Sequence, residues 1–276
     1  MNAIASATFS LLDNLSLYRR YIGIAIRSQL QYRASFIMTL LGNLVTTGIE
    51  FLGIWALFDR FGNLRGWTLP EIALFYGVVN VAFAIAEALA RGFDTFPNLV
   101  KSGDFDRLLL RPRSTALQVA GGELQLMRSG RLVQGLVVLG WSLHSLGIGL
   151  GVGTMAVISC AVLAGVCIFA GLFVLQATLS FWTIETLEIM NTVTYGGTET
   201  AQYPLTIYRP WFRRFFTFVV PLACANYLPL TPLLGRVESE GFQSMVVVSP
   251  LVGLLFLGVS FGLWKVGVRH YHSTGS

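Results

Sequence analysis

The chain has 276 residues, of which 54% are hydrophobic and only 12% are charged, and its formal net charge is +5. Ordinary soluble domains carry about 25% charged residues, so the composition excludes disorder, a fibrous repeat and a secreted disulfide scaffold, and it disfavours a soluble enzyme. In a soluble protein, an excess of positive charge indicates nucleic acid binding. In a membrane protein it is expected, because basic residues are enriched in cytoplasmic loops.

An amphipathic helix is predicted over residues 9–33. Its apolar side chains recur at helical spacing: Leu11, Leu15, Tyr18, Ile22, Ile26 and Leu30. Arg20 and Arg27 lie off that stripe, so the helix has a basic face. A helix of this kind lies along a membrane surface. We expect it at the cytoplasmic interface, where it either only anchors the chain or has a further role.

Six segments are long and apolar enough to be membrane spans, since a spanning helix needs about 20 mostly apolar residues. They are residues 34–58, 70–90, 132–150, 154–182, 215–234 and 245–264. Residues 132–184 contain no Asp, Glu, Lys or Arg, and four alternating glycines, from Gly147 to Gly153, predict the reversal that divides this stretch into two spans. The sequence therefore predicts an all-α integral membrane protein with one transmembrane domain over residues 1–276.

The distribution of Lys and Arg predicts the orientation of these spans. With the N-terminus in the cytoplasm, 16 of the 19 basic residues fall in cytoplasmic segments and only Arg60, Arg65 and Arg236 fall outside. The predicted cytoplasmic set includes the loop over residues 92–131 and the stretch 209–214 before the fifth span. Because basic residues are enriched on the cytoplasmic side, we expect a multi-pass protein with both termini cytoplasmic.

The loop over residues 92–131 contains a short predicted helix. Asp94 or Thr95 can cap it, Pro97 suits its first turn, Lys101 its last turn and Gly103 its end. This helix is expected to display three apolar side chains, those of Phe96, Leu99 and Val100. An apolar helix in a cytoplasmic loop either binds a partner or packs on the spans of its own chain.

Ionisable side chains inside a predicted span are costly and therefore candidates for function. Glu50 in the first span either lines a polar pathway or pairs across a helix interface. Glu87 has Arg91 four residues later, so we expect the two to form an ion pair. Asn43 can hydrogen-bond between helices or line the same pathway.

The fifth predicted span is interrupted by prolines, among them Pro221 and Pro229. Each proline frees a backbone carbonyl that lipid cannot satisfy. We therefore expect this helix to be broken or re-entrant and, together with Asn226 and Tyr227, to form part of a polar pathway or an outer gate.

No motif for catalysis is present. The sequence lacks GxxxxGK[ST], HExxH and GxSxG, and its cysteines and histidines do not have the spacing of metal ligands. Glu185 and Glu188 lie three residues apart without a suitably placed His or Arg. We therefore expect a chain that is not an enzyme and has no catalytic residue, metal site or cofactor of its own. A membrane enzyme centred on Glu185, Glu188 and His144 is the least favoured alternative.

Three groups of residues carry a resemblance to a known family. They are Gly103-Asp-Phe-Asp-Arg-Leu-Leu-Leu-Arg-Pro112, then Gln202-Tyr-Pro-Leu-Thr-Ile-Tyr208, and then Phe218-x-x-Pro221-x-Ala223-x-x-Asn226-Tyr227-x-Pro229. In this order and spacing they resemble the permease subunits of bacterial type-2 ABC transporters, in the branch described as ABC-2 family transporter protein.

This resemblance implies an ATP-driven exporter in the bacterial inner membrane. Such permeases pair as homodimers or heterodimers, form the translocation path, and dock two copies of a separate ATP-binding subunit that holds ATP and Mg. Their substrates include small molecules, peptides and lipids, and no nucleic acid partner is implied.

A coupling helix between spans two and three would contact that ATPase. By position, the coupling residues here are Phe93, Asp94, Phe96, Pro97, Leu99, Val100, Gly103, Asp106, Leu109, Arg111 and Pro112. The main alternative is a proton-coupled secondary transporter that uses Glu50 and Glu87.

Overall fold

The computed structural model describes residues 2–123, 129–183, 187–236 and 242–273. This part of the chain is helical apart from its connections and one isolated bridge between Leu64 and Trp67. Four helical stretches are long and apolar enough to cross a membrane, and there are five if the bent pair over residues 210–233 is counted as one span. The four are Arg33–Phe61, Leu69–Lys101, Val152–Leu179 and Val246–Arg269.

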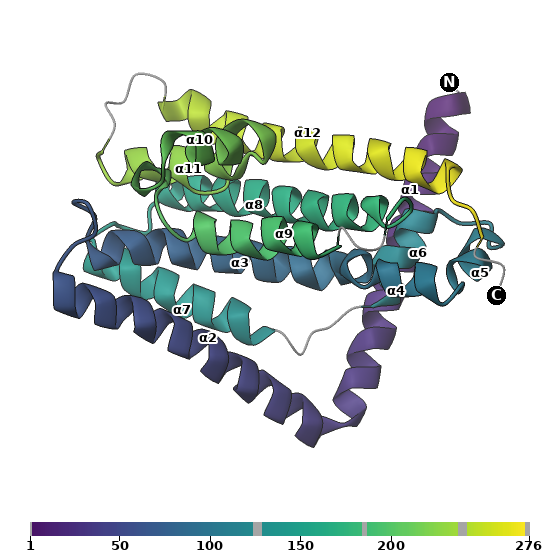
Figure 1. Ribbon diagram of the computed structural model, residues 1–276, viewed down its shortest axis with the longest axis horizontal. Helices are drawn as coiled ribbons and strands as arrows, with labels where there is room; N and C mark the ends of the chain where they lie inside the picture. The colour runs from purple at the N-terminus through teal and green to yellow at the C-terminus, as the bar shows by residue number, and fades with distance from the viewer. Residues whose placement is uncertain (1, 124–128, 184–186, 237–241, 274–276) are drawn as a thin grey trace.

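The long helices run side by side in one bundle (Figure 1). They are α2 (Arg33–Phe61), α3 (Leu69–Asp94), α7 (Ser129–Ser145), α8 (Val152–Leu179), α9 (Leu187–Ala201) and α12 (Phe242–Arg269). The centre is α3, which packs against α7, α8 and α9, while α8 also packs against α12. Most side chains of α3 are buried, as expected for a helix that is apolar on all sides. By contrast, α2 contacts mainly α7 and leaves most of its apolar surface exposed.

Each end of the bundle carries a distinct set of short helices (Figure 1). One end, called the α4–α6 end, holds α1 (Asn2–Gln31), α4 (Phe96–Lys101), α5 (Phe105–Leu109), α6 (Thr115–Gly122) and the C-terminal residues. The opposite end, called the α10–α11 end, holds η2 (Leu205–Ile207), α10 (Pro210–Arg214), η3 (Phe215–Val219), η4 (Leu222–Cys224) and α11 (Tyr227–Leu233). The α2–α3 and α7–α8 connections also lie there.

Local sequence signals mark the start of α3, directly after the α2–α3 connection. The carboxylate Oε2 of Glu71 accepts hydrogen bonds from the backbone N of Thr68 at 2.8 Å and from its Oγ1 at 2.9 Å. Glu71, three residues after Thr68, thereby holds both the backbone N–H and the hydroxyl of the residue that precedes the first turn. The α7–α8 reversal uses Gly147, whose φ of +66° is readily available only to glycine.

The segment from residue 205 to residue 236, called the bent segment, enters and leaves at the same end of the bundle. Near its start, Ile207 O accepts from Arg65 Nη1 at 2.8 Å, and at its end Arg236 Nη2 donates to Gly66 O at 2.7 Å. Its two helical parts meet at 79°. The predicted break is present, and both ends of this segment contact the same α2–α3 connection, which is the arrangement of a re-entrant segment. A fifth span over residues 215–234 stays a prediction.

Helix α9, which was not among the predicted spans, lies along the bundle beside α3 and α8 (Figure 1). This changes the predicted side of three arginines. Arg209, Arg213 and Arg214 lie at the α10–α11 end, opposite α4 and α5, whereas the sequence analysis grouped them with residues 92–131. The basic residues assigned to the α10–α11 end therefore number six instead of three, and the charge bias between the ends is weaker than predicted.

Helix α1 crosses the α4–α6 end at a steep angle to the bundle (Figure 1). It is held there by Tyr18, whose hydroxyl donates to Leu89 O at 2.8 Å, and by an ion pair of 2.6 Å between Asp13 and Arg113. Arg20 and Arg27 are exposed, as expected of a basic face. The side chains of Leu11 and Leu15 lie outside the described part of the helix.

Arg236 fastens the bent segment to the start of α3. Its Nε and Nη2 lie 2.6 and 2.7 Å from the two carboxylate oxygens of Glu71, and its guanidinium lies 4.0 Å from the ring centroid of Trp67. Such a fork of paired hydrogen bonds is specific to arginine, because the lysine ammonium cannot make it. The Glu71 side chain is only 10% exposed and depends on this partner.

Replacing Arg236 by alanine is expected to lower the free energy of unfolding by roughly 2 kcal/mol, since it leaves a mostly buried carboxylate unpaired. Arg236→Lys should recover only part of the loss. Thermal unfolding of the purified protein in detergent measures the effect. Arg213→Ala removes an exposed arginine from the same end and is the matched control. Equal midpoints for Arg236→Ala and Arg213→Ala would contradict the fastening role.

Candidate functional site

A polar cavity lies inside the bundle between α2, α3, α7 and α9. Its volume is about 110 Å³, which is enough to hold several water molecules. The lining residues come from all four helices: Asn43, Thr46, Thr47, Glu50, Phe83, Glu87, Arg131 and Tyr195. In a bundle this apolar, a cavity with acidic, basic and hydroxyl side chains is the place where a polar molecule can be accommodated.

Helix α2 contributes one polar face to this cavity. Asn43, Thr47 and Glu50 recur at helical spacing, while apolar residues between them are exposed on the other side. The Thr47 hydroxyl donates to Asn43 O at 2.9 Å within the same helix, so Glu50 is the charge that α2 presents. Glu50 lines the cavity and is exposed, and its role in a pathway stays a prediction.

The positive charge of the cavity comes from Arg131 at the start of α7. Its guanidinium lies 5.1 Å from the ring centroid of Phe83 and interacts electrostatically with Glu199 of α9. It reaches this depth because the preceding residue is Gly130: a Cβ there would lie 3.0 Å from Leu44 N and 3.1 Å from Leu40 O. The sequence analysis missed Arg131, which it assigned to the loop. The adjacent Gly-Arg pair was the available signal.

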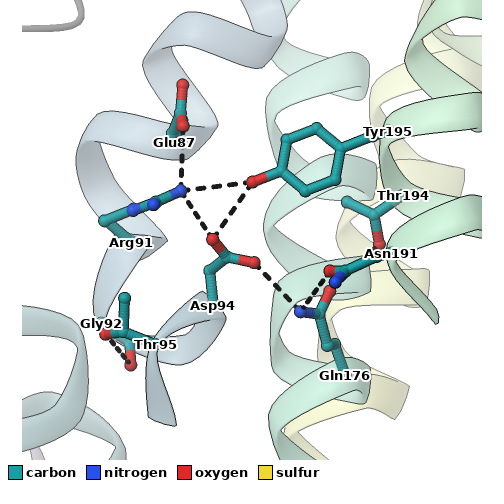
Figure 2. A network of polar contacts seen from close by, with 9 residues as sticks. All are labelled: Glu87, Arg91, Gly92, Asp94, Thr95, Gln176, Asn191, Thr194 and Tyr195. Atoms are coloured by element: carbon teal, nitrogen blue, oxygen red, sulfur yellow. Dashed lines mark hydrogen bonds and ion pairs between the residues drawn. The ribbon is translucent and has the colours of Figure 1, made fainter. Parts of the chain in front are cut away.

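A hydrogen-bonded network, called the Arg91 network, closes the cavity toward the α4–α6 end (Figure 2). Arg91 Nη1 lies 3.1 Å from Glu87 Oε1, 2.6 Å from Asp94 Oδ2 and 3.2 Å from the hydroxyl of Tyr195. The predicted pair between Glu87 and Arg91 is confirmed. Arg91 also bonds Asp94 and Tyr195, so one guanidinium joins α3 to α9.

The network continues from α3 to α8 and back to α9 (Figure 2). The Tyr195 hydroxyl donates to Asp94 Oδ2 at 3.1 Å, and Gln176 Nε2 donates to Asp94 Oδ1 at 3.0 Å and to Asn191 Oδ1 at 2.9 Å. These side chains are mostly buried, and a buried polar group is stable only when it has such partners. The network therefore fixes the relative position of three helices.

A second polar hollow of about 270 Å³ lies on the other side of the Arg91 network. Asp94, Asn98, Asn191 and Tyr195 are among its lining residues. Tyr195 lines both hollows, Arg91 lines the second one, and its partner Glu87 lines the polar cavity. Polar groups therefore extend from Glu50 to the start of α4, and the Arg91 network connects the two hollows.

The other predicted pathway residues lie elsewhere. Pro221, Asn226 and Pro229 are buried in the bent segment and Tyr227 is half-buried; none of them lines the polar cavity. Asn226 Nδ2 donates to Ala201 O, and its Oδ1 accepts from the backbone N of Tyr227. Asn226 thereby attaches the bent segment to the end of α9, and its role as a gate stays a prediction.

The short helix predicted in the loop over residues 92–131 is present as α4, but its apolar side chains are not displayed. Phe96 and Val100 are buried, so their predicted exposure is wrong; Leu99 is half-buried. Phe93 and Pro97 are also buried. The reason is an aromatic cluster that the sequence gives no means to foresee, because it joins α4 and α5 to the ends of α8 and α12. Its members are Phe96, Phe105, Phe181, Trp264 and Tyr271.

Phe96 is at the centre of this aromatic cluster. Its ring centroid lies 4.8 Å from Trp264, 4.9 Å from Phe105 and 5.2 Å from Phe181, and all three pairs are edge-on. Burial and the neighbouring carboxylate of Asp106 raise the pKa of Tyr271 above its ordinary value. Asp106 also accepts a hydrogen bond of 2.6 Å from Ser273 Oγ. The C-terminal residues therefore pack on α5.

The exposed part of this region is the end of α5 and the residues after it. Residues 107–113, called the docking tip, include Leu110, which is 86% exposed, and Leu109, which is 40% exposed. Arg111 and Pro112 are exposed as well. Gly103 adopts a φ of +75° at the turn between α4 and α5, as its predicted role at a helix end requires. Of the predicted coupling residues, those in the docking tip are the ones accessible to a partner.

The membrane-enzyme alternative rests on three residues, of which the structure describes one side chain. Glu185 and the side chain of Glu188 lie outside the described part of the chain, and His144 is exposed in the last turn of α7. Within the described residues, no group of three or more His, Cys, Asp or Glu side chains could hold a metal ion.

Comparison with known proteins identifies one match. The sequence profile of the family described as ABC-2 family transporter protein matches residues 44–275. The matched range includes Glu50, the Arg91 network, the docking tip and the bent segment. No curated protein and no solved structure matches the chain.

The Arg91 network predicts a large effect of a single charge. Arg91→Met leaves Glu87 and Asp94 buried without their cation, and we expect the free energy of unfolding to fall by about 3 kcal/mol. Arg113→Met, which breaks the exposed pair with Asp13, should cost less than about 1 kcal/mol. Thermal or denaturant unfolding in detergent measures both. A loss for Arg91→Met no larger than that for Arg113→Met would show that the network is not structural.

Proposed function

The chain belongs to the ABC-2 transporter family and is a multi-pass membrane permease of an ABC transporter, and we propose that it forms the translocation path of an ATP-driven exporter. One observation carries this proposal: a line of polar groups runs through an apolar bundle, from the polar cavity through the Arg91 network to the end that bears α4 and α5. A path for a substrate needs such groups, whereas a purely structural bundle would avoid their desolvation cost.

The path is proposed to form between two protomers. Glu50 on α2 and Glu199 on α9 are both exposed, and the two carboxylates interact electrostatically. Two carboxylates facing lipid would be unfavourable, so a second copy or a related permease is expected to cover this side. The cavity between the protomers would then have acidic groups on both walls, with Arg131 as the local counter-charge.

ATP hydrolysis is assigned to a separate subunit, present in two copies, that binds ATP and Mg. The docking tip is the part of this chain proposed to contact it. Leu110 and Leu109 offer apolar contacts, while Arg107 and Arg111 offer positive charge at the same place. Exposed apolar side chains with a charged rim are typical of a protein interface.

The aromatic cluster provides the mechanical connection. Phe96 and Phe105 of α4 and α5 pack on Phe181, just after α8, and on Trp264 of α12. A displacement of the docking tip would therefore move the ends of α8 and α12 with it, because packed aromatic rings are not compressible. A change at this end can reach the Arg91 network directly, since Asp94 is only two residues before Phe96.

Energy coupling then follows from differential affinity. ATP stabilises the closed pair of ATPase subunits. The permease state that fits the closed pair is then favoured by at most the difference between the binding free energies of ATP in the two states. For the path to open, the hydrogen bonds of the Arg91 network must break, so that α3 and α9 can move apart at Tyr195. The substrate would then pass the Arg91 network while the chain itself performs no covalent chemistry.

A pair of matched variants tests the docking tip. Leu110→Asp places a charge in the proposed interface, and Leu150→Asp places the same charge on an exposed leucine at the opposite end. Co-purification of the ATP-binding subunit with tagged permease should fall by at least about tenfold for Leu110→Asp and stay unchanged for Leu150→Asp.

Retention of the ATP-binding subunit by both variants would overturn the docking assignment. Transport by permease reconstituted without any ATPase, abolished by Glu50→Gln, would instead establish the proton-coupled alternative through Glu50 and Glu87.

A further inference from the structure

A groove between α6 and α12 lies outside the proposed transport path and shares no lining residue with the polar cavity. Its volume is about 600 Å³, and it lies at the α4–α6 end, away from the polar cavity. Its walls come from two helices that are far apart in sequence. On α6 they include Leu117 and Ala120, and on α12 they include Phe261 and Val268. All four side chains are half-buried, so the groove is a shaped apolar surface with an open side.

Two cations lie on the α12 wall of this α6–α12 groove. Lys265 and Arg269 are one helical turn apart and both are exposed. Like charges at this spacing repel each other. In the described part of the chain, neither of them forms an ion pair with a carboxylate. An anion bound between them would remove the repulsion, and the described residues place no carboxylate there.

The position of these cations along α12 identifies the kind of anion. Val246–Arg269 is long and apolar enough to cross a membrane, and Lys265 and Arg269 occupy its last turn. In a bilayer the last turn of a span reaches the phosphate layer, while Phe261, one turn earlier, lies at the depth of the acyl chains. The groove thus combines a site for a phosphate with a slot for a hydrocarbon chain.

We propose that the α6–α12 groove binds an anionic phospholipid of the surrounding bilayer. Its phosphate lies between Lys265 and Arg269, and one acyl chain lies along Leu117, Phe261 and Val268. Basic pockets between membrane helices on the cytoplasmic side recognise such headgroups. Charge complementarity selects an anionic lipid, and the apolar walls distinguish it from free phosphate.

A bound lipid would also act on the coupling region. Trp264 lines the groove and donates from Nε1 to Thr115 Oγ1 at 3.3 Å, while its ring packs on Phe96 in the aromatic cluster. Filling the groove would hold α6 and α12 together at the residue on which α4 depends. We therefore expect the lipid to stabilise the docking tip region as well as the bundle.

The test uses the full-length permease in mixed micelles. Phosphatidylglycerol, phosphatidylcholine and inorganic phosphate are added separately, and the apparent dissociation constant is taken from the rise in the thermal unfolding midpoint. Wild type should be stabilised by phosphatidylglycerol only. Lys265→Gln combined with Arg269→Gln should bind phosphatidylglycerol about thirtyfold more weakly, since each cation near a lipid phosphate contributes roughly fivefold.

The matched control is Arg213→Gln combined with Arg214→Gln, which removes two exposed charges from α10 at the opposite end of the bundle. It should keep wild-type affinity. Equal loss in this control would show a general effect of surface charge and overturn the site, and so would stabilisation of wild type by phosphatidylcholine or by inorganic phosphate.

A second variant, Ala120→Phe, keeps both cations and fills the apolar part of the α6–α12 groove. It should also weaken phosphatidylglycerol binding, and an unchanged affinity for phosphatidylglycerol would contradict the position of the acyl chain. The proposal is independent of the docking tip. If the Lys265 and Arg269 variant kept its lipid affinity but lost the ATP-binding subunit, the groove would be part of the subunit interface instead.

Discussion

The requirement that buried charges be paired governs the whole bundle. Arg91 attaches α9 to the bundle, because the half-buried hydroxyl of Tyr195 would otherwise lack its cationic partner. The hydrogen bonds of Arg91, Asp94 and Gln176 then join α3, α8 and α9. The polar cavity exists because this arrangement holds α9 next to α2 and α3. The connection between the two hollows and the cohesion of the bundle thus depend on the same guanidinium.

The sequence predicts most of the helices correctly, since lipid imposes a simple rule on them. The segments around α2, α3, α7, α8 and α12 are apolar over the length of a span, and hydropathy finds them. It fails for α9, whose polar side chains are satisfied by neighbouring helices and leave no apolar signal. Residues 215–234 are apolar over the length of a span as well, and their prolines correctly predict that the helix is broken.

The candidate site was predictable only in part, for a related reason. Glu50 stands out because its own helix is apolar, and Glu87 with Arg91 stands out by spacing. Arg131 and Tyr195 do not stand out in the sequence. Arg131 reaches the cavity because α7 packs closely on α2 at Gly130, and such a contact cannot be read from the sequence. Phe96 was expected at an interface and is buried instead, since its partners Phe181 and Trp264 are remote in sequence. The exposed docking tip is what remains for a partner.

The two ends of the bundle have different tasks in this arrangement: one carries the docking tip and the other the bent segment. The most direct test is their placement on opposite sides of the membrane. Cysteines at Leu110 and at Trp211, both exposed, are introduced singly into a chain with Cys160, Cys167 and Cys224 replaced by alanine. In intact cells a membrane-impermeant maleimide should label Trp211→Cys, and it should label Leu110→Cys only after permeabilisation. Labelling of both from the same side would contradict the bundle and the transport path derived from it.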